Sequence, residues 1–152
     1  PVDAAHVLEE LDGRIDAVLD SGPCTVGVES TVVDLTDPNT PTLLRPGGIT
    51  LEELVAICPH ISLPQTTSDV APHSPGRMVS HYAPHLPVRL NAVQAEPDEA
   101  LRAFGATRPT LAPLVWNLSA AGNLEEAAAM LFTGLRTLDL EGQTRGLRRI
   151  SA

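Results

Sequence analysis

Residues 27–48, which read GVESTVVDLTDPNTPTLLRPGG, constrain the fold of this chain more than any other stretch. Residues 26–35 are rich in valine and threonine and are followed by turn-forming residues, which is typical of a β-strand. The DPNTP sequence at residues 37–41 predicts a turn, and TLLR at residues 42–45 predicts a short returning strand. The sequence therefore predicts a β-hairpin that ends at an arginine followed by Pro-Gly-Gly.

Three further elements are predicted around this hairpin. Residues 4–11 (AAHVLEEL) place apolar side chains at helical spacing, and Asp3 suits the N-cap position. Residues 15–19 (IDAVL) alternate as the residues of a strand would. Thr50 is placed to cap a helix over residues 51–57, whose first turn carries two glutamates that suit the helix dipole.

The second half of the chain predicts a small α/β unit behind a linker. Residues 59–87 are rich in proline and lack apolar periodicity, which is typical of a linker or an ordered loop. The elements expected after it are a strand at residues 88–90, a helix at 98–104, a strand at 111–118 and a helix at 123–138. Because strands and helices alternate, we expect a parallel sheet. Residues 140–152 are weakly patterned and look like an incomplete domain end.

The charge of the chain is uneven, and this bears on its partners. The net charge is −9; residues 1–60 carry 11 acidic and 2 basic side chains, whereas residues 61–152 carry 8 of each. A protein that binds a nucleic-acid backbone needs several cations to neutralise the phosphates. We therefore do not expect direct RNA binding by this chain.

Composition also bears on the compartment. Hydrophobic residues make up 43% of the chain, yet no run of apolar residues is long enough for a transmembrane helix and no signal peptide is visible. The 2 cysteines form no paired framework, which is typical of a reducing compartment. We expect a cytoplasmic protein without a membrane partner. Because the chain starts at Pro1 and not at a methionine, we interpret it as a fragment of a longer protein.

The hairpin carries the strongest candidates for a binding site. Ser30 and Thr31 lie in or beside the first strand on opposite faces, so that one of them can face a pocket and bond a ligand carboxylate or ammonium. The alternative is that both are ordinary strand residues. Arg45 lies before a proline and two glycines, where its guanidinium suits a phosphate. The alternative is an ion pair with Asp34 or Glu29.

The proline-rich segment carries two weaker candidates. Tyr82 lies between prolines, where it can either close over a nucleotide by stacking or anchor the segment to a domain as an apolar side chain. Several residues could on paper ligate a metal: Cys58, His60, His73, His81 and His85. Their spacing matches no usual zinc pattern, so we expect no structural metal.

Taken together, these motifs resemble those of a known family. GVESTVVDLT followed by LLRPGGIT, then SPG and HYAP in the proline-rich segment, resembles the two-domain YrdC-like L-threonylcarbamoyladenylate (threonylcarbamoyl-AMP) synthases. AAHVLEELDGRIDAVLDSGPC upstream and VWNLSAAGNLEEAAAMLFTGLRTLD downstream extend the resemblance to about residues 3–139. The two signature stretches together make it fairly specific.

The resemblance implies an activity and a set of partners. Such enzymes condense L-threonine, bicarbonate and ATP, with Mg²⁺ accompanying the ATP, into threonylcarbamoyl-AMP and release pyrophosphate. The product feeds the N6-threonylcarbamoyl modification of adenosine 37 in tRNAs. The resemblance assigns L-threonine binding to Ser30 and Thr31, and ATP binding to Arg45 and Tyr82. It assigns no catalytic residue and no protein-bound metal.

The resemblance also implies an organisation. It makes residues 1–58 the C-terminal part of a twisted YrdC-type α/β catalytic domain, residues 59–87 a linker that serves as a lid, and residues 88–152 a truncated Rossmann-like α/β domain. The family's Lys/Arg phosphate-binding motif and its Ser-x-Asn motif are not among these 152 residues, and Arg77–Ser80 stand where the family has Met-Lys-Tyr-Arg. We therefore expect the chain to be inactive on its own. The alternative function is a non-catalytic nucleotide-binding or double-stranded RNA-binding module of the same fold.

Overall fold

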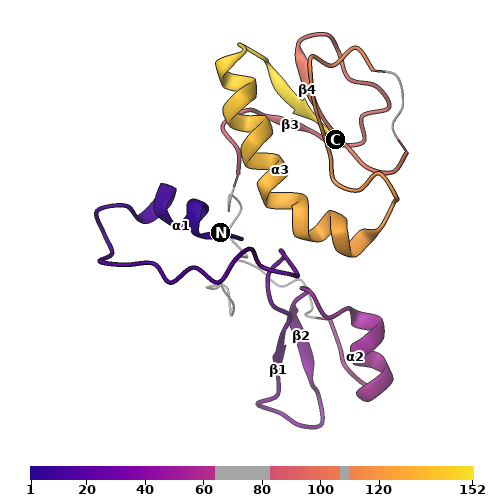
Figure 1. The fold of residues 1–152 in the computed structure, drawn as a ribbon. Coiled ribbons are helices and arrows are strands. Elements are labelled where there is room, and N and C mark those ends of the chain that lie inside the picture. Colours follow the sequence, from indigo (N-terminus) through magenta and orange to yellow (C-terminus); the bar gives the residue numbers. More distant parts are fainter. Residues whose placement is uncertain (64–82, 107–109) are drawn as a thin grey trace. The chain divides into compact units, whose positions relative to one another are not determined.

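The structure is a computed structural model that describes residues 1–63, 83–106 and 110–152 (Figure 1). The chain divides into two compact units, one made of Pro1–Gly27 with Pro84–Ala152 and the other of Val28–Ala83. No helix among the described residues is long and apolar enough to cross a membrane. Each unit combines helix and strand, so the chain has the α/β fold that its sequence predicts.

The smaller unit is built on the predicted hairpin. Strands β1 (Val32–Asp34) and β2 (Thr42–Arg45) pair antiparallel. The register shifts between Val32 and Val33, so that Val32 lies opposite Arg45 beyond a bulge. The bulge ends the regular pairing at the residue that the sequence marks as a phosphate-binding candidate.

Strand β1 is shorter than the predicted strand at residues 26–35. The residues just before β1 bond to the loop after β2 and not to a neighbouring strand, since the Gly48 N–H donates to the Glu29 carbonyl over 3.1 Å. Backbone groups engaged in this way cannot continue the ladder. The valine- and threonine-rich pattern thus marks both the strand and the segment against which the loop folds.

Helix α2 (Leu51–Ile57) follows this loop and has the predicted bounds. A capping box begins it: the Thr50 hydroxyl accepts from the Glu53 N–H over 3.2 Å, and the Glu53 carboxylate accepts from the Thr50 N–H over 2.8 Å. The cap therefore fixes the point at which the chain leaves the loop and enters the helix.

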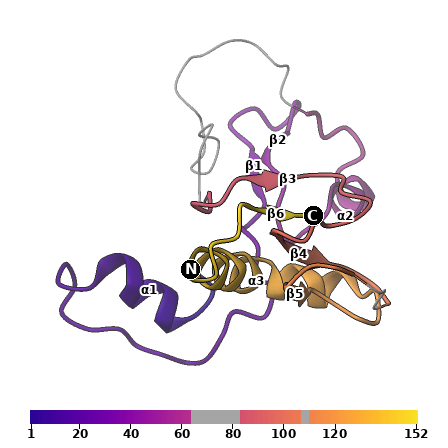
Figure 2. The same cartoon turned by 90° about the horizontal axis from the view of Figure 1, so that it is seen from above.

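The larger unit contains a parallel sheet, as predicted. Its strands, in spatial order, are β3 (Val88–Arg89), β6 (Arg149–Ser151), β4 (Glu99–Ala103) and β5 (Leu114–Asn117), and each neighbouring pair is parallel. Helix α3 (Leu124–Thr144) connects β5 to β6 and packs against β4, β5 and β6 (Figure 2). The strand that is last in sequence thus lies inside the sheet.

The core of this unit lies between the sheet and α3. Leu138 of α3 and Ile150 of β6 are fully buried, and Leu86 and Ala100 complete the cluster. Three partly buried side chains pack around it: Leu114, Trp116 and Leu147. Burial of these side chains against one another is what holds the helix on the sheet.

Helix α1 (Ala4–Leu11) also belongs to this unit and has the predicted bounds and cap. The Asp3 carboxylate accepts from the His6 N–H over 2.9 Å. Arg136 of α3 forms ion pairs with Glu9 and Glu10 of α1. The acidic face of α1 is therefore partly neutralised within the unit.

Two predicted elements are wrong, because local sequence patterns did not determine the structure at these positions. The helix expected at residues 98–104 is absent, because residues 99–103 of this stretch form β4. Their Glu, Ala, Leu and Arg residues favour helix, but β4 is bonded on both sides, to β5 and to β6, and this pairing outweighs intrinsic propensity. Residues 15–19 form no strand. Ile15 is 39% exposed and Leu19 fully exposed, so their alternation does not mark a buried face.

Residues 140–152, which look weakly patterned in the sequence, nevertheless form regular elements: α3 continues to Thr144, and Arg149–Ser151 forms β6 between β3 and β4. A three-residue strand is too short to show periodicity. It is identified only through its partners.

A buried carboxylate ties three strands of the sheet together. Glu99 of β4 is 1% exposed. It accepts a hydrogen bond from Arg89 Nε of β3 over 3.2 Å and forms an ion pair with Arg149 of β6, whose Nε lies 3.2 Å away. The Glu96 N–H donates to it as well, over 3.0 Å. The hydrogen bonds from Arg89, together with the bond from the Glu96 N–H and the charges of both arginines, stabilise the ionised carboxylate more than burial destabilises it. They lower the pKa of Glu99 to about 2.

The larger unit is therefore expected to lose stability as pH falls from about 4.5, the ordinary pKa of the Glu99 carboxyl, toward the folded value of about 2. In this range the unfolded chain takes up a proton that the folded chain does not, so acid favours unfolding. Urea titrations followed by fluorescence of the 1 tryptophan would show the midpoint falling between pH 5 and pH 3. The Glu96→Gln variant keeps the N–H contact and should retain this pH dependence, whereas Glu99→Gln should reduce it. An unchanged midpoint in the unsubstituted chain would contradict the expectation.

Candidate functional site

The candidate site lies where the loop after β2 folds onto the residues before β1. Gly47 packs directly on their backbone: a Cβ there would lie 2.2 Å from the Glu29 oxygen, 2.4 Å from the Thr31 nitrogen and 2.5 Å from the Ser30 carbonyl carbon. Only glycine allows so close an approach. The structure thus identifies residues 29–31 as the segment that this loop approaches.

Thr31 fastens this loop from the other side. Its hydroxyl donates to the Ile49 carbonyl over 2.7 Å and accepts from the Ile49 N–H over 3.0 Å. Ile49 directly precedes Thr50, the cap of α2. Thr31 thereby joins the start of β1 to the entry of the helix.

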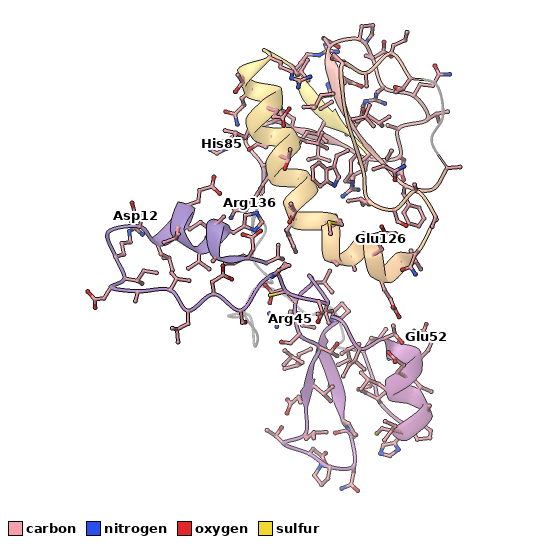
Figure 3. The ribbon with its side chains drawn as sticks, viewed as in Figure 1. Asp12, Arg45, Glu52, His85, Glu126 and Arg136 are labelled. Atoms are coloured by element: carbon pink, nitrogen blue, oxygen red, sulfur yellow. The ribbon has the colours of Figure 1, made fainter. Side chains whose placement is uncertain are left out.

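Arg45 closes the site from the end of β2, where Figure 3 labels it. Its Nε donates to the Ser30 carbonyl over 3.0 Å, and its Nη2 donates to the Ser30 hydroxyl over 2.9 Å. Its Nη1 lies 3.2 Å from the Glu29 carboxylate, and the Arg45 side chain is 13% exposed. The ion pair to Glu29 that the sequence left open is therefore present, while a phosphate-binding role stays a prediction.

This arrangement defines what the site can do chemically. The Ser30 hydroxyl accepts from Arg45 and keeps its own proton, which suits an acceptor such as a ligand carboxylate. A guanidinium fixed by three protein groups is a preorganised donor for an anion. The cluster joins a hydroxyl and a guanidinium within hydrogen-bond distance, as a site for a polar, anionic molecule requires.

The structure brings together three of the four candidates named from the sequence. Ser30, Thr31 and Arg45 meet around the loop, and Tyr82 lies outside the described residues. Glu29 enters the cluster as the partner of Arg45, and Ile49 enters through its backbone alone. A backbone contact leaves no signature in the residue type, so sequence reasoning could not have found Ile49.

A second polar cluster lies in the larger unit, at His85, which Figure 3 labels. The Asp139 carboxylate of α3 accepts from the N–H groups of His85 and Leu86 over 3.0 and 2.8 Å, and its Oδ2 lies 2.9 Å from His85 Nδ1. Burial raises the pKa of Asp139, but the bonds from Leu86 and His85 outweigh it and lower the pKa. This carboxylate serves to anchor the chain at its entry into the unit.

The candidate metal ligands are only partly described. Cys58 Sγ lies 3.8 Å from His60 Nε2, and His85 is engaged with Asp139. His73 and His81 lie outside the described residues. Within residues 1–63, 83–106 and 110–152, no group of three or more His, Cys, Asp or Glu side chains is placed to hold a metal ion.

Two known families match adjacent parts of this chain. The family described as threonylcarbamoyl-AMP synthase, C-terminal domain, matches residues 49–151, and a family described as telomere recombination matches residues 1–47. Ser30, Thr31 and Arg45 lie within residues 1–47, which match the telomere recombination family, and Ile49 is the first residue of the other match.

Individual relatives point the same way. The threonylcarbamoyl-AMP synthase of Bacillus subtilis (strain 168) is 36% identical over 155 residues, which cover 91% of this chain and 44% of the relative. That of Schizosaccharomyces pombe is 34% identical, with 93% of this chain and 42% of the relative covered. The crystal structure of Pyrococcus abyssi Sua5 complexed with L-threonine matches all of this chain and 48% of its own, with a TM-score of 0.74 and 29% identity. The chain spans less than half the length of these relatives.

Proposed function

The chain belongs to the threonylcarbamoyl-AMP synthase family, and on that premise we propose that it carries part of the active site of such an enzyme. The reaction would condense L-threonine, bicarbonate and ATP into threonylcarbamoyl-AMP and release pyrophosphate, and the product would serve the N6-threonylcarbamoyl modification of adenosine 37 in tRNA. The observation that carries the proposal is the Ser30–Arg45 hydrogen bond, which joins a hydroxyl to a guanidinium in the region that matches these relatives. The relative from P. abyssi has been crystallised with L-threonine.

The pair Ser30–Thr31 is proposed to form the L-threonine site. The free proton of the Ser30 hydroxyl can bond to the substrate carboxylate, which only accepts hydrogen bonds. Ser30 is exposed, whereas Thr31 is half-buried. The exposed hydroxyl is thus the one that an amino acid reaches without displacing protein groups.

Arg45 is proposed to contact the phosphates of ATP. Its guanidinium is fixed in place, so little conformational freedom is lost when an anion binds. Mg²⁺ would arrive with the ATP phosphates as part of that substrate, and we propose no protein-bound metal. Tyr82, on the segment at residues 59–87, is proposed to close over the nucleotide.

The chemistry asks mainly for positioning. The amino group of threonine and bicarbonate first give a carbamate, with loss of water. A carbamate oxygen then attacks the α-phosphorus of ATP, and the bond to the bridging oxygen of the β-phosphate breaks, so that pyrophosphate leaves. The carbamate is an unstable and weak nucleophile, so exclusion of water and alignment dominate. A cation near the α-phosphate offsets the charge that develops during the transfer.

The organisation proposed with this function has three parts. Residues 1–58 are proposed to belong to the catalytic domain, residues 59–87 to a lid, and residues 88–152 to a small C-terminal domain, although residues 1–27 form one compact unit with residues 84–152 in this chain. The product would pass to the tRNA-modifying machinery in the cytoplasm. A non-catalytic nucleotide-binding or RNA-binding module is less supported, because the relatives above are all named as synthases.

Threonine-dependent pyrophosphate release from ATP and bicarbonate tests this proposal. We expect none from the chain alone, and release from a protein in which the preceding half of the B. subtilis relative is joined to residues 1–152. In the joined protein, Arg45→Ala should lower kcat/KM for ATP by about 100-fold, because a preorganised phosphate contact is lost. Arg14→Ala is the matched control: it removes the other basic side chain of residues 1–60, which is exposed, and should change little.

Two outcomes would count against the synthase. A folded joined protein that binds ATP tightly without threonine-dependent release would be a binding module. If Arg45→Ala does not change threonine-dependent pyrophosphate release, the proposed reaction stands but Arg45 does not contribute to it.

A further inference from the structure

Thr31 differs from its neighbour Ser30 in how its hydroxyl is used. A threonine hydroxyl has one hydrogen to donate. In Thr31 this hydrogen goes to the Ile49 carbonyl over 2.7 Å, and the same oxygen accepts from the Ile49 N–H over 3.0 Å. A substrate carboxylate, which accepts only, would have to break the shorter of these bonds. Thr31 is therefore committed to the protein.

The bonds of Thr31 hold the loop at residues 46–49 against the residues before β1. Gly48 adds a bond from its N–H to the Glu29 carbonyl over 3.1 Å, and Gly47 lies in direct contact with the backbone of residues 29–31. These contacts lie between the two residues of the proposed site: Ser30 is on one segment, and Arg45 directly precedes the other. The alignment of the guanidinium on the Ser30 hydroxyl thus depends on how closely the two segments are held.

We infer that Thr31 is a positioning residue, a clasp that holds the loop at residues 46–49 so that Arg45 meets Ser30. Only Ser30 of the pair then contacts L-threonine. This inference rests on the proposed function for its catalytic consequence, while the clasp itself is a property of the folded chain. Threonine suits the role because its branched side chain has few rotamers and carries a hydroxyl at the branch.

Amide hydrogen exchange on this chain tests the clasp without any activity. Thr31→Val keeps the shape of the side chain and removes the hydroxyl, so exchange at the Ile49 and Gly48 amides should rise about tenfold, as expected for the loss of about one net hydrogen bond. Thr31→Ser keeps the hydroxyl and should stay within about threefold of the unsubstituted chain. Ser30→Ala leaves the clasp intact and should not change exchange at Ile49. Unchanged exchange in Thr31→Val would overturn the inference.

Kinetics of the joined protein test the consequence. Thr31→Val should lower kcat/KM for both ATP and L-threonine by about tenfold, because both partners of the Ser30–Arg45 bond lose alignment, and Thr31→Ser should restore it. Ser30→Ala should raise KM for L-threonine most, because it removes the proposed substrate contact, and should lower kcat/KM for ATP less, because Arg45 keeps its bond to the backbone carbonyl at position 30. If Thr31→Val raises only KM for L-threonine and leaves kcat/KM for ATP unchanged, then Thr31 contacts the substrate and the inference is wrong.

The two measurements separate the possible failures. If the unsubstituted joined protein shows no threonine-dependent release while Ile49 exchange responds to Thr31→Val, the proposed function fails and the clasp stands. If release is present and neither readout responds to Thr31→Val, the clasp fails and the proposed function stands.

Discussion

Replacing Gly47 by alanine is expected to abolish the candidate site. A methyl group at this position would lie 2.2 to 2.5 Å from backbone atoms of Glu29, Ser30 and Thr31, and backbone cannot rotate away as the tip of a side chain can. The loop must lift from residues 29–31, which breaks the bonds of Ile49 to Thr31 and separates Arg45 from Ser30. We expect the loss of about 3 kcal/mol of local stability, at the upper end of overpacking effects.

The same substitution should remove activity from the joined protein. A displacement of about 1 Å in positioning groups lowers rates by about 100-fold, and the lift required here is at least of that order. Hydrogen exchange at the Gly48 and Ile49 amides provides the structural readout. Pro46→Ala is the neighbouring control: Pro46 is exposed, so only a small effect is expected. If Gly47→Ala and Pro46→Ala show similar hydrogen exchange and similar activity, the close contact of Gly47 with residues 29–31 is not needed to form the site.

The second large effect is expected at Gly134 of α3. A Cβ there would lie 2.5 Å from Cδ1 and 2.6 Å from Nε1 of the Trp116 indole. Alanine improves helix propensity by about 1 kcal/mol over glycine, but the rigid indole must move out of its packed position. The Trp116 Nε1 is buried and has no hydrogen-bond partner among the described residues, so packing alone holds the ring. We expect a net loss of about 2 kcal/mol.

Gly142 of the same helix offers a matched control. A Cβ at Gly142 would lie 2.7 Å from Cδ1 of Leu86, which is the flexible tip of a side chain. The small cost of moving the Leu86 methyl group offsets the gain in helix propensity, so Gly142→Ala should change the free energy of unfolding little. Urea unfolding followed by Trp116 fluorescence compares the two variants directly. Equal midpoints for Gly134→Ala and Gly142→Ala would show that the indole does not constrain the helix.

The elements that the sequence predicts well are those with local causes. Helices α1 and α2 are found at their predicted bounds because Asp3 and Thr50 cap them. A capping residue lies directly beside the helix that it begins, so it can be identified from the local sequence. The hairpin is found because turn residues separate two short apolar runs. In the two helices and in the hairpin, the residues that interact are separated by only a few positions in the sequence.

The elements that the sequence misses depend on distant partners. β4 is made of helix-forming residues and becomes a strand only because β5 and β6 flank it. β6 is too short to have a period of its own. The candidate site divides in the same way: Ser30, Thr31 and Arg45 stand out by residue type, whereas the proposed division of roles between Ser30 and Thr31 rests on bonds to the backbone of Ile49, which no residue type reveals.

The position of β6 inside the sheet has a consequence for how the chain is made. During synthesis β3, β4 and β5 leave the ribosome before β6, and among the described residues β3 pairs with β6 alone, so that this pairing waits until β6 has emerged. Until then only β4 and β5 can pair, and the buried Glu99 lacks Arg149. Pairing of segments this far apart in sequence is slow. The sheet of the larger unit can therefore be completed only after β6 has been translated, and until then the β4–β5 pair and the unpaired β3 expose strand edges.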